Sequence, residues 1–172
     1  MTWGLLSAPA PIVDGHDLGS FDCGVLSLNG WLNQHALQNE RSGASRTYVL
    51  CADREVVGYY CLATGAIDQD EAPGPLRRNM PDPIPVLVLG RLAIDRRYQN
   101  QGLGHAMLRD AIMRALQVAE IVGAVALLVH ALSELARRFY LSSGFVALPL
   151  QPMTLCLLIR TAHQAGIGGV RN

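Results

Sequence analysis

Hydrophobic positions recur with two different periods along the chain, and the period changes within one short stretch. Residues 86–89 form a continuous aliphatic run after several prolines, which is typical of a strand buried on both faces. From Leu103 onward, apolar residues recur every three or four positions, which predicts an amphipathic helix. The segment 91–104, which reads R-L-A-I-D-R-R-Y-Q-N-Q-G-L-G, therefore joins a strand to a helix.

The same patterns predict the remaining elements. Before residue 86 we expect a first strand within residues 1–13, a helix over 26–39, an antiparallel pair of strands over 47–52 and 56–66, and a long proline-rich loop over 68–85. After the central helix we expect a strand over 124–130, a helix over 133–142, strands from 145 and over 153–159, and a loose tail over 161–172. This order predicts an α+β fold around a mixed sheet.

Length and composition limit the class of protein. With 172 residues and 50% hydrophobic content, we expect one domain. No apolar run approaches the roughly 20 residues needed to span a bilayer, and the start lacks the basic end of a secretion signal, so we expect a cytoplasmic protein without membrane contact. The four cysteines are widely scattered, which favours reduced core thiols and no metal site.

Charge is distributed unevenly although its sum is zero. Residues 1–71 contain 3 Arg and 9 acidic residues, whereas residues 72–172 contain 11 Arg and 5 acidic residues. All 14 basic residues are Arg, whose planar fork suits phosphate, but a GC-rich genome would give the same bias. The pattern leaves both interpretations open.

The turn at residues 99–104 is a candidate anion site. Where a glycine-containing turn opens a helix, several N–H groups lack an intrahelical partner and the helix dipole favours negative charge. A side chain at Gly102 or Gly104 would crowd an incoming pyrophosphate, and Arg96 or Arg97 would add charge at the rim. The alternative is an ordinary turn and helix start.

These residues resemble the GNAT superfamily of acetyl-CoA-dependent N-acyltransferases. The family signature Q/R-x-x-G-x-G/A is matched by Gln99, Asn100, Gln101, Gly102, Leu103 and Gly104. It is preceded by the strand that admits the pantetheine arm, at Leu92, Ala93 and Ile94, and followed by A-R-R-F-Y-L-S-S-G-F. The resemblance implies a GNAT domain over 1–160 with a mixed, mostly antiparallel sheet flanked by helices, a tail over 161–172, and acetyl-CoA as donor. Asn100 replaces a frequent glycine, which matters little if its φ is negative.

A narrower resemblance covers residues 21–158. The stretches F-D-C-G-V-L-S-L-N-G-W-L, S-G-A-S-R-T-Y-V and V-L-G-R-L-A-I-D-R-R-Y-Q are similar to the acetyltransferase toxins of type II toxin–antitoxin modules. That family acetylates the α-amino group of aminoacyl-tRNA and blocks translation. Its partner is a ribbon-helix-helix antitoxin, through which the complex binds operator DNA and represses its own operon. The alternatives are a GNAT enzyme acting on a small amine or protein amine, and a DNA-binding corepressor acting with its antitoxin.

The residue chemistry agrees with an α-amino acceptor. An α-amine with a pKa near ~8 is partly neutral at physiological pH, whereas a lysine near ~10.4 benefits from a general base. The strand 87–94 holds no Asp or Glu, and Asp95 lies past its end. The family resemblance implies that Tyr140 lies beside the thioester sulfur and protonates the leaving thiolate. The alternative is a core aromatic residue paired with Phe139, and one of these two neighbours should face the core and the other the cleft.

Other residues are weaker candidates. Ser133 either reaches the pantetheine or the 3′ phosphate of the cofactor, or simply caps the helix that follows it. One of Tyr59 and Tyr60 is a candidate for lining the acceptor cleft. The late apolar strand 153–159 suggests a homodimer formed through the C-terminal strands. Candidate contacts to the tRNA backbone, which would weaken with salt, are Arg46, Arg77, Arg78, Arg91, Arg137 and Arg138.

Overall fold

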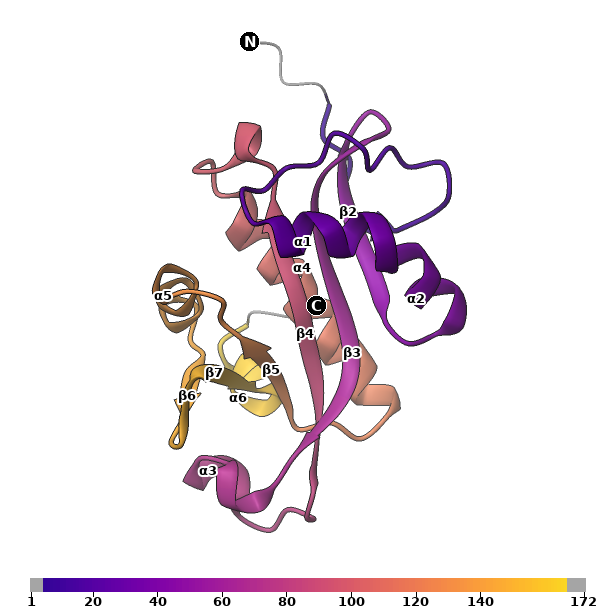
Figure 1. The fold of residues 1–172 in the computed structure, drawn as a ribbon. Helices are drawn as coiled ribbons and strands as arrows, with labels where there is room; N and C mark the ends of the chain where they lie inside the picture. Colours follow the sequence, from indigo (N-terminus) through magenta and orange to yellow (C-terminus); the bar gives the residue numbers. More distant parts are fainter. Residues whose placement is uncertain (1–4, 167–172) are drawn as a thin grey trace. The chain divides into compact units, whose positions relative to one another are not determined.

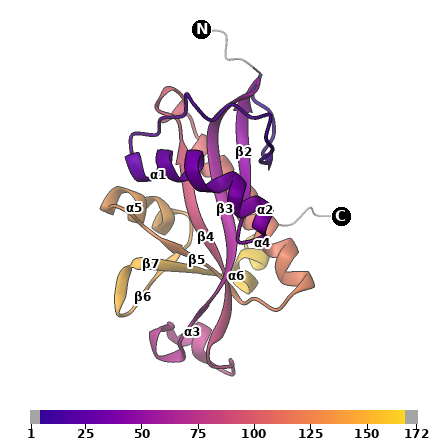
Figure 2. The same cartoon turned by 45° about the vertical axis from the view of Figure 1, so that its right-hand side comes forward.

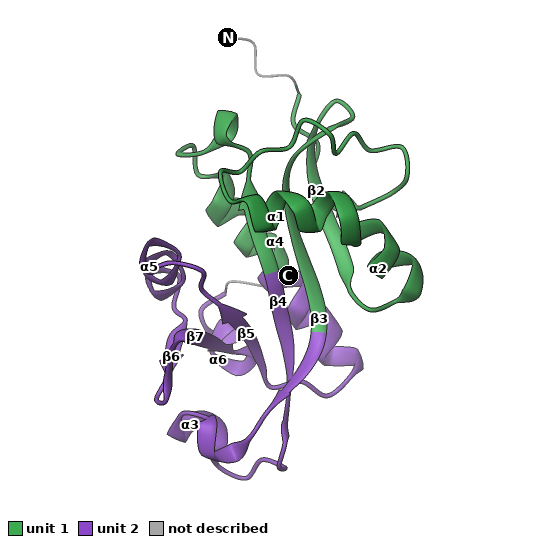
Figure 3. Ribbon diagram, viewed as in Figure 1, with its two compact units in different colours: residues 1–63, 91–111 green, residues 64–90, 112–172 purple. Residues whose placement is uncertain are grey.

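A computed structural model describes residues 5–166. The described residues form two compact units, residues 5–63 with 91–111 and residues 64–90 with 112–166, as coloured in Figure 3. Two strands and the longest helix run through both units. These are β3 (Glu55–Ile67), β4 (Ile84–Ile94) and α4 (Leu103–Ile121).

The sheet of the first unit is built on an antiparallel hairpin. β2 (Arg46–Ala52) pairs with β3, with Arg46 opposite Leu62 and a turn through Asp53 at φ 55°. The hairpin predicted over 47–66 is therefore confirmed. The predicted first strand is much shorter than expected: β1 (Ala10–Pro11) contributes two residues beside β2, because the flanking prolines cannot donate ladder hydrogen bonds.

Helices cover both faces of this sheet. The helix predicted over 26–39 is confirmed as α1 (Leu26–Trp31), a π-helical turn η1 (Leu32–Ala36) and α2 (Leu37–Ser42), which ends at Gly43 with φ 79°. It crosses one face of β2 and β3 (Figures 1 and 2). Successive strand residues point to opposite faces, so the Tyr59 hydroxyl bonds the Leu28 carbonyl and the Tyr60 hydroxyl bonds Asp110 of α4. Both rings are fully buried.

The second unit continues the sheet. β4 pairs in parallel with β5 (Ala126–His130), while β7 (Gln151–Leu158) pairs antiparallel with β5 and with β6 (Val146–Leu148). The strand order is β1-β2-β3-β4-β5-β7-β6. The predicted α+β fold with a mixed, mostly antiparallel sheet is confirmed. Helix α5 (Glu134–Ser142) lies between β5 and β6 in the chain, as predicted.

Two segments predicted to lack regular structure contain helices. The loop expected over 68–85 includes the 3-10 turn η2 (Gln69–Glu71) and helix α3 (Gly74–Arg77), because Pro75 sits at the start of a helix, where it is tolerated, and Leu76 is fully buried. The tail expected from residue 161 begins instead with α6 (Ile159–Gln164), whose Ala162 is fully buried. Residues 167–172 lie outside the described part. The domain boundary at 160 stays a prediction.

Within residues 5–166, Cys23, Cys51, Cys61 and Cys156 are buried free thiols. Burial raises the pKa of Cys156 to about 11, so this thiol is protonated. Residues 5–166 contain no cluster of three or more potential metal ligands. No helix among them has the length and apolar character needed to cross a membrane.

Candidate active site

The turn between β4 and α4 presents backbone N–H groups at one point of the first unit. After β4 come the 3-10 turn η3 (Arg96–Tyr98) and residues 99–102, and the Ala106 N–H donates to the Gly102 carbonyl at 3.1 Å, which begins the helix. The N–H groups of residues 102–104 precede this first bond and have no intrahelical acceptor. A Cβ at Gly102 would meet no atom within 4 Å, so the space beside this residue is open to a ligand.

Two residues of this turn have left-handed backbone. Gly102 has φ 81° and Asn100 has φ 61°. The condition under which Asn100 would matter little, a negative φ, is therefore not met. Asparagine is one of the few residues besides glycine that adopt this backbone conformation readily.

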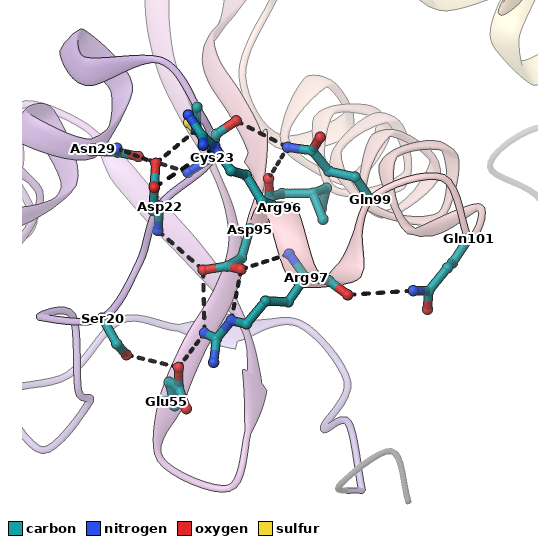
Figure 4. Close-up of polar contacts among 12 residues, drawn as sticks. Ser20, Asp22, Cys23, Asn29, Glu55, Asp95, Arg96, Arg97, Gln99 and Gln101 are labelled. Atoms are coloured by element: carbon teal, nitrogen blue, oxygen red, sulfur yellow. Dashed lines mark hydrogen bonds and ion pairs between the residues drawn. The ribbon is translucent and has the colours of Figure 1, made fainter. Parts of the chain in front are cut away.

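A buried carboxylate holds the start of the turn. Asp95 is 1% exposed, and its oxygens accept from the Arg97 N–H at 2.9 Å, the Arg97 Nε at 3.0 Å and the Asp22 N–H at 3.0 Å (Figure 4). Burial alone would raise the pKa of Asp95, but these hydrogen bonds outweigh it and the net pKa is lowered. Asp95 is therefore a fixed anion whose lone pairs are engaged, and not a base for the acceptor amine.

The arginines of the turn have different surroundings. Arg97 is bound by both Asp95 and Glu55, and Ser20 donates to the same Glu55 at 2.8 Å. Arg96 is 64% exposed and lies 3.7 Å from Asp22. Of the two arginines expected to add charge at the phosphate rim, Arg96 is the more exposed and has the weaker ion pair.

Gln99 contributes its side chain to the scaffold. Its Nε2 donates to the Cys23 carbonyl at 2.9 Å and to the Ile94 carbonyl at 2.8 Å, tying the turn to the segment before α1 and to the end of β4 (Figure 4). The Gln99 N–H also donates within the turn, to the Arg96 carbonyl at 3.4 Å, so a cofactor contact by Gln99 stays a prediction. Gln101 Nε2 makes a long contact of 3.5 Å to the Arg97 carbonyl.

The predicted pantetheine strand is closely packed against β3. Leu92 is half-buried, and Ala93 and Ile94 are buried. A Cβ added at Gly58 would lie 2.9 Å from Ile94 Cδ1, so glycine is needed there for the close approach of the two strands. The strand end that precedes the turn is thus held in position.

Tyr140, the predicted proton donor, lies on α5 in the second unit. It is 6% exposed, and its ring makes edge contacts with Phe139 at 5.1 Å and Phe145 at 5.5 Å between centroids. No hydrogen-bond partner of its hydroxyl is found among residues 5–166, and the only fully enclosed unpartnered side-chain oxygens of that range belong to Ser45 and Thr47. The Tyr140 hydroxyl therefore reaches solvent. Burial raises the pKa of Tyr140, so the phenol carries its proton.

Ser133 caps the helix that carries Tyr140. Its backbone is extended, and its Oγ accepts from the Ala136 N–H at 3.1 Å. The N-cap interpretation is therefore confirmed, while a cofactor contact by Ser133 stays a prediction.

The six candidate tRNA-binding arginines fall into three groups. Arg77 donates to three backbone carbonyls of its own loop, so these donors are engaged within the protein and its contact to tRNA stays a prediction. Arg46 pairs with Glu40, and Arg137 and Arg138 share Glu134. Arg78 is exposed, and Arg91 packs over the Trp31 ring at 4.5 Å. Tyr59 and Tyr60, one of which was expected to line the acceptor cleft, are both fully buried, so that expectation is wrong.

Comparisons with known proteins place this arrangement in a family. A family model described as an acetyltransferase (GNAT) domain matches residues 43–147. A tRNA-acetylating toxin of Mycobacterium tuberculosis is 49% identical over 157 residues, covering 91% of this chain and 95% of that protein. A probable toxin TacT of Sinorhizobium fredii is 27% identical, covering 85% and 87%.

Solved structures agree with these relatives. AtaT complexed with acetyl-methionyl-tRNAfMet has a TM-score of 0.86 at 32% identity, and a tyrosine-to-phenylalanine mutant of KacT has a TM-score of 0.87 at 28% identity; each covers 93% of this chain and 98% of the other. Other similar structures hold AtaTR with acetyl-CoA, AtaT with the C-terminus of its antitoxin AtaR, and the AtaT–AtaR complex with DNA. The chain therefore belongs to the GNAT acetyltransferase family.

Proposed function

We propose that this protein is a toxin that transfers acetyl from acetyl-CoA to the α-amino group of aminoacyl-tRNA and thereby blocks translation. The observation that carries the proposal is the 49% identity to a tRNA-acetylating toxin over 91% of the chain. The structural neighbour AtaT is complexed with acetyl-methionyl-tRNAfMet, the product that such a reaction gives. We place this activity in the cytoplasm, where charged tRNA is found.

The turn before α4 fits the donor. The N–H groups of residues 101–104 would bind the pyrophosphate of acetyl-CoA, because they stand at the positive end of a 19-residue helix. Leu92, Ala93 and Ile94 would lie along the pantetheine arm. The open space beside Gly102 supports this fit, since a larger residue there would occupy it.

Tyr140 is the proposed proton donor. A neutral α-amine needs no enzymic base to attack the acetyl carbonyl, and its surplus proton passes to solvent. As the carbon–sulfur bond breaks, the Tyr140 hydroxyl would give its proton to the departing thiolate and recover one from water. The phenol suits this role because it is protonated, fixed by Phe139 and Phe145, and without a hydrogen-bond partner among the described residues.

The decisive experiment incubates the purified protein with acetyl-CoA and total tRNA charged with amino acids. We expect acetylated aminoacyl-tRNA, detected by mass spectrometry of the released amino acid, and little acetylation of free amino acids or of a peptide N-terminus. Acetylation of the free amines with none of the charged tRNA would replace this proposal with the small-amine or protein-amine alternative.

A second role follows from the DNA complexes of two similar toxin–antitoxin pairs, KacTA and AtaT–AtaR. We propose that a ribbon-helix-helix antitoxin neutralises this protein and that the pair represses its operon, with DNA contacted through the antitoxin. The gene beside this one should encode that small basic partner. A homodimer through the C-terminal strands stays a prediction, to be checked by light scattering.

A further inference from the structure

Arg91 is the one half-buried arginine within residues 5–63 and 91–111, since the other arginines of this part are exposed. Arg41, Arg46, Arg96 and Arg97 each pair with a carboxylate, at Asp14, Glu40, Asp22 and Asp95 respectively, whereas Arg54 and Arg109 are open to solvent. Arg91 is half-buried, yet it has no ion pair or hydrogen bond of its side chain within residues 5–166. Its nitrogens are also absent from the fully enclosed unpartnered atoms of that range, so its donors reach solvent. Hydrogen bonds from these N–H groups to an anion would be favourable, because the half-buried side chain has no acceptor for them within the described residues.

The guanidinium is held by a column of aromatic rings. Its Cζ lies 4.5 Å from the centre of the Trp31 ring, and Tyr59 stacks on Trp31 with ring centroids 5.9 Å apart and an angle of 10° between planes. Tyr59 is fixed in turn by Phe21 at its edge and by the bond of its hydroxyl to the Leu28 carbonyl at 2.7 Å. Because Trp31 and Tyr59 are buried, the column restricts where Arg91 can place its fork.

The position of Arg91 on β4 places it near the reaction. It directly precedes Leu92, Ala93 and Ile94, and a strand rises about 3.3 Å per residue, so Arg91 lies within roughly 10 Å of the end of that strand. An acceptor amine must come to this strand to meet the acetyl group. In an aminoacyl-tRNA the carboxyl group of the amino acid is esterified, so the nearest anion is the phosphodiester one ribose away.

We propose that Arg91, supported by Trp31, binds a phosphodiester at the 3′ end of the aminoacyl-tRNA and so selects an esterified nucleic acid over a free amine. This inference rests on the proposed function and names the residue that recognises its substrate. A guanidinium fork matches the paired oxygens of a phosphate, and its orientation on the indole determines where the 3′ end enters.

The test compares Arg91→Ala with Arg91→Lys and with the control Arg41→Ala, which removes an exposed arginine of the same unit. For Arg91→Ala we expect the KM for aminoacyl-tRNA to rise about tenfold or more, while the KM for acetyl-CoA changes less than twofold. Arg91→Lys should recover part of the loss, because it keeps the charge without the fork. Arg41→Ala should leave both KM values unchanged.

Salt dependence separates phosphate recognition from a structural role. We would measure the binding of an acceptor-stem RNA hairpin that ends in CCA and carries no amino acid, from low to high salt. The slope of log affinity against log salt concentration should be smaller by about one unit in Arg91→Ala than in the wild type. Acetylation of an amino acid methyl ester, which has no phosphate, should be the same for the variant and the wild type. Trp31→Phe should give a smaller rise in the KM for aminoacyl-tRNA at an unchanged salt slope, since the arginine remains.

The outcomes distinguish failure of this inference from failure of the proposed function. An unchanged salt slope for hairpin binding in Arg91→Ala would overturn the phosphate contact, whether or not the wild type acetylates charged tRNA. A rise in the KM for acetyl-CoA instead would assign Arg91 to the cofactor and also overturn it. A wild type that binds the hairpin through Arg91 but acetylates no aminoacyl-tRNA would refute the proposed function alone. Acetyl-CoA binding and thermal midpoints verify that each variant is folded.

Discussion

The turn before α4 and the tyrosine on α5 differ in how their polar groups are held. In the first unit, Asp95, Arg97 and Gln99 use their hydrogen-bonding groups on one another and on the neighbouring backbone. In the second unit, Tyr140 is surrounded by aromatic rings, and its hydroxyl has no partner among the described residues. The polar side chains of the turn therefore hold its backbone in position, and the groups proposed to bind the cofactor are backbone N–H groups. In Tyr140 the proposed functional group is the side-chain hydroxyl itself.

This difference predicts two kinds of mutational effect. Changes in the turn should alter acetyl-CoA binding, because they move the N–H groups that we propose bind the pyrophosphate. Changes at the Tyr140 hydroxyl should alter the rate of the chemical step and leave acetyl-CoA binding almost unaffected.

Tyr140→Phe should have the largest effect. It removes only the hydroxyl, so the packing against Phe139 and Phe145 is kept, and we expect kcat to fall by about 10² to 10⁴. Acetyl-CoA affinity, measured by calorimetry, should change less than twofold, and growth arrest on expression should be relieved. Toxicity that persists in Tyr140→Phe would remove this residue from the mechanism.

Gly104→Val should come next and should act on binding alone. A branched side chain in the first turn of α4 would crowd the pyrophosphate, and it would not weaken the helix, because valine has a higher helix propensity than glycine. We expect acetyl-CoA affinity to fall below detection, a loss of about a hundredfold or more. Gly30→Ala is the control, since a Cβ at this helical position of α1 meets nothing within 4 Å. An unchanged dissociation constant for Gly104→Val would contradict the phosphate cradle.

Asp95→Asn tests whether the polar network supports the turn. The amide keeps the shape but loses the charge and one acceptor, so we expect a loss of about 1–3 kcal/mol of unfolding free energy and an acetyl-CoA dissociation constant raised about tenfold. Asp14→Asn, at an exposed ion pair with Arg41, should change neither quantity. A destabilised variant with unchanged acetyl-CoA affinity would separate the network from the cradle.

The pH dependence of this effect has a definite sign. The pKa of Asp95 is lower in the folded protein than its ordinary value near ~3.9. Its contribution to stability is therefore fully present above that ordinary pKa and is lost as the pH falls through the lower folded pKa. Urea unfolding should accordingly give a constant difference between wild type and Asp95→Asn from pH 6 to 8, and a shrinking difference in acid.

The turn itself could be predicted from the sequence because its signals are local. A change of hydrophobic period, two glycines and a six-residue signature all fall within residues 86–104. The network beneath it could not be predicted, because Asp22 and Asp95 are 73 residues apart and no local pattern pairs them. The same holds for Arg91 over Trp31, which join a strand to a helix far earlier in the chain.

Burial was harder to predict than periodicity. Alternation along β3 correctly places Tyr59 and Tyr60 on opposite faces, but it cannot say that helices cover both faces, so neither ring is available to a substrate. Proline content likewise indicated an irregular loop over 68–85, whereas Leu76 supplies enough buried apolar surface for a short helix to form there.

Ser133→Ala should have the smallest effect. It tests whether Ser133 of the second unit only caps α5 or also contacts the cofactor. The Oγ caps α5 through the Ala136 N–H, so its loss should cost about 1 kcal/mol of unfolding free energy. If capping is its whole role, acetyl-CoA affinity stays within twofold of the wild type and kcat falls only slightly, through a less rigid Tyr140.

Ser133→Asp, which keeps an N-cap acceptor, should restore the stability. A several-fold loss of acetyl-CoA affinity in Ser133→Ala, measured by calorimetry, would instead make Ser133 a cofactor contact. In that case Ser133→Asp should bind acetyl-CoA more weakly still, because its carboxylate would face the phosphates of the cofactor.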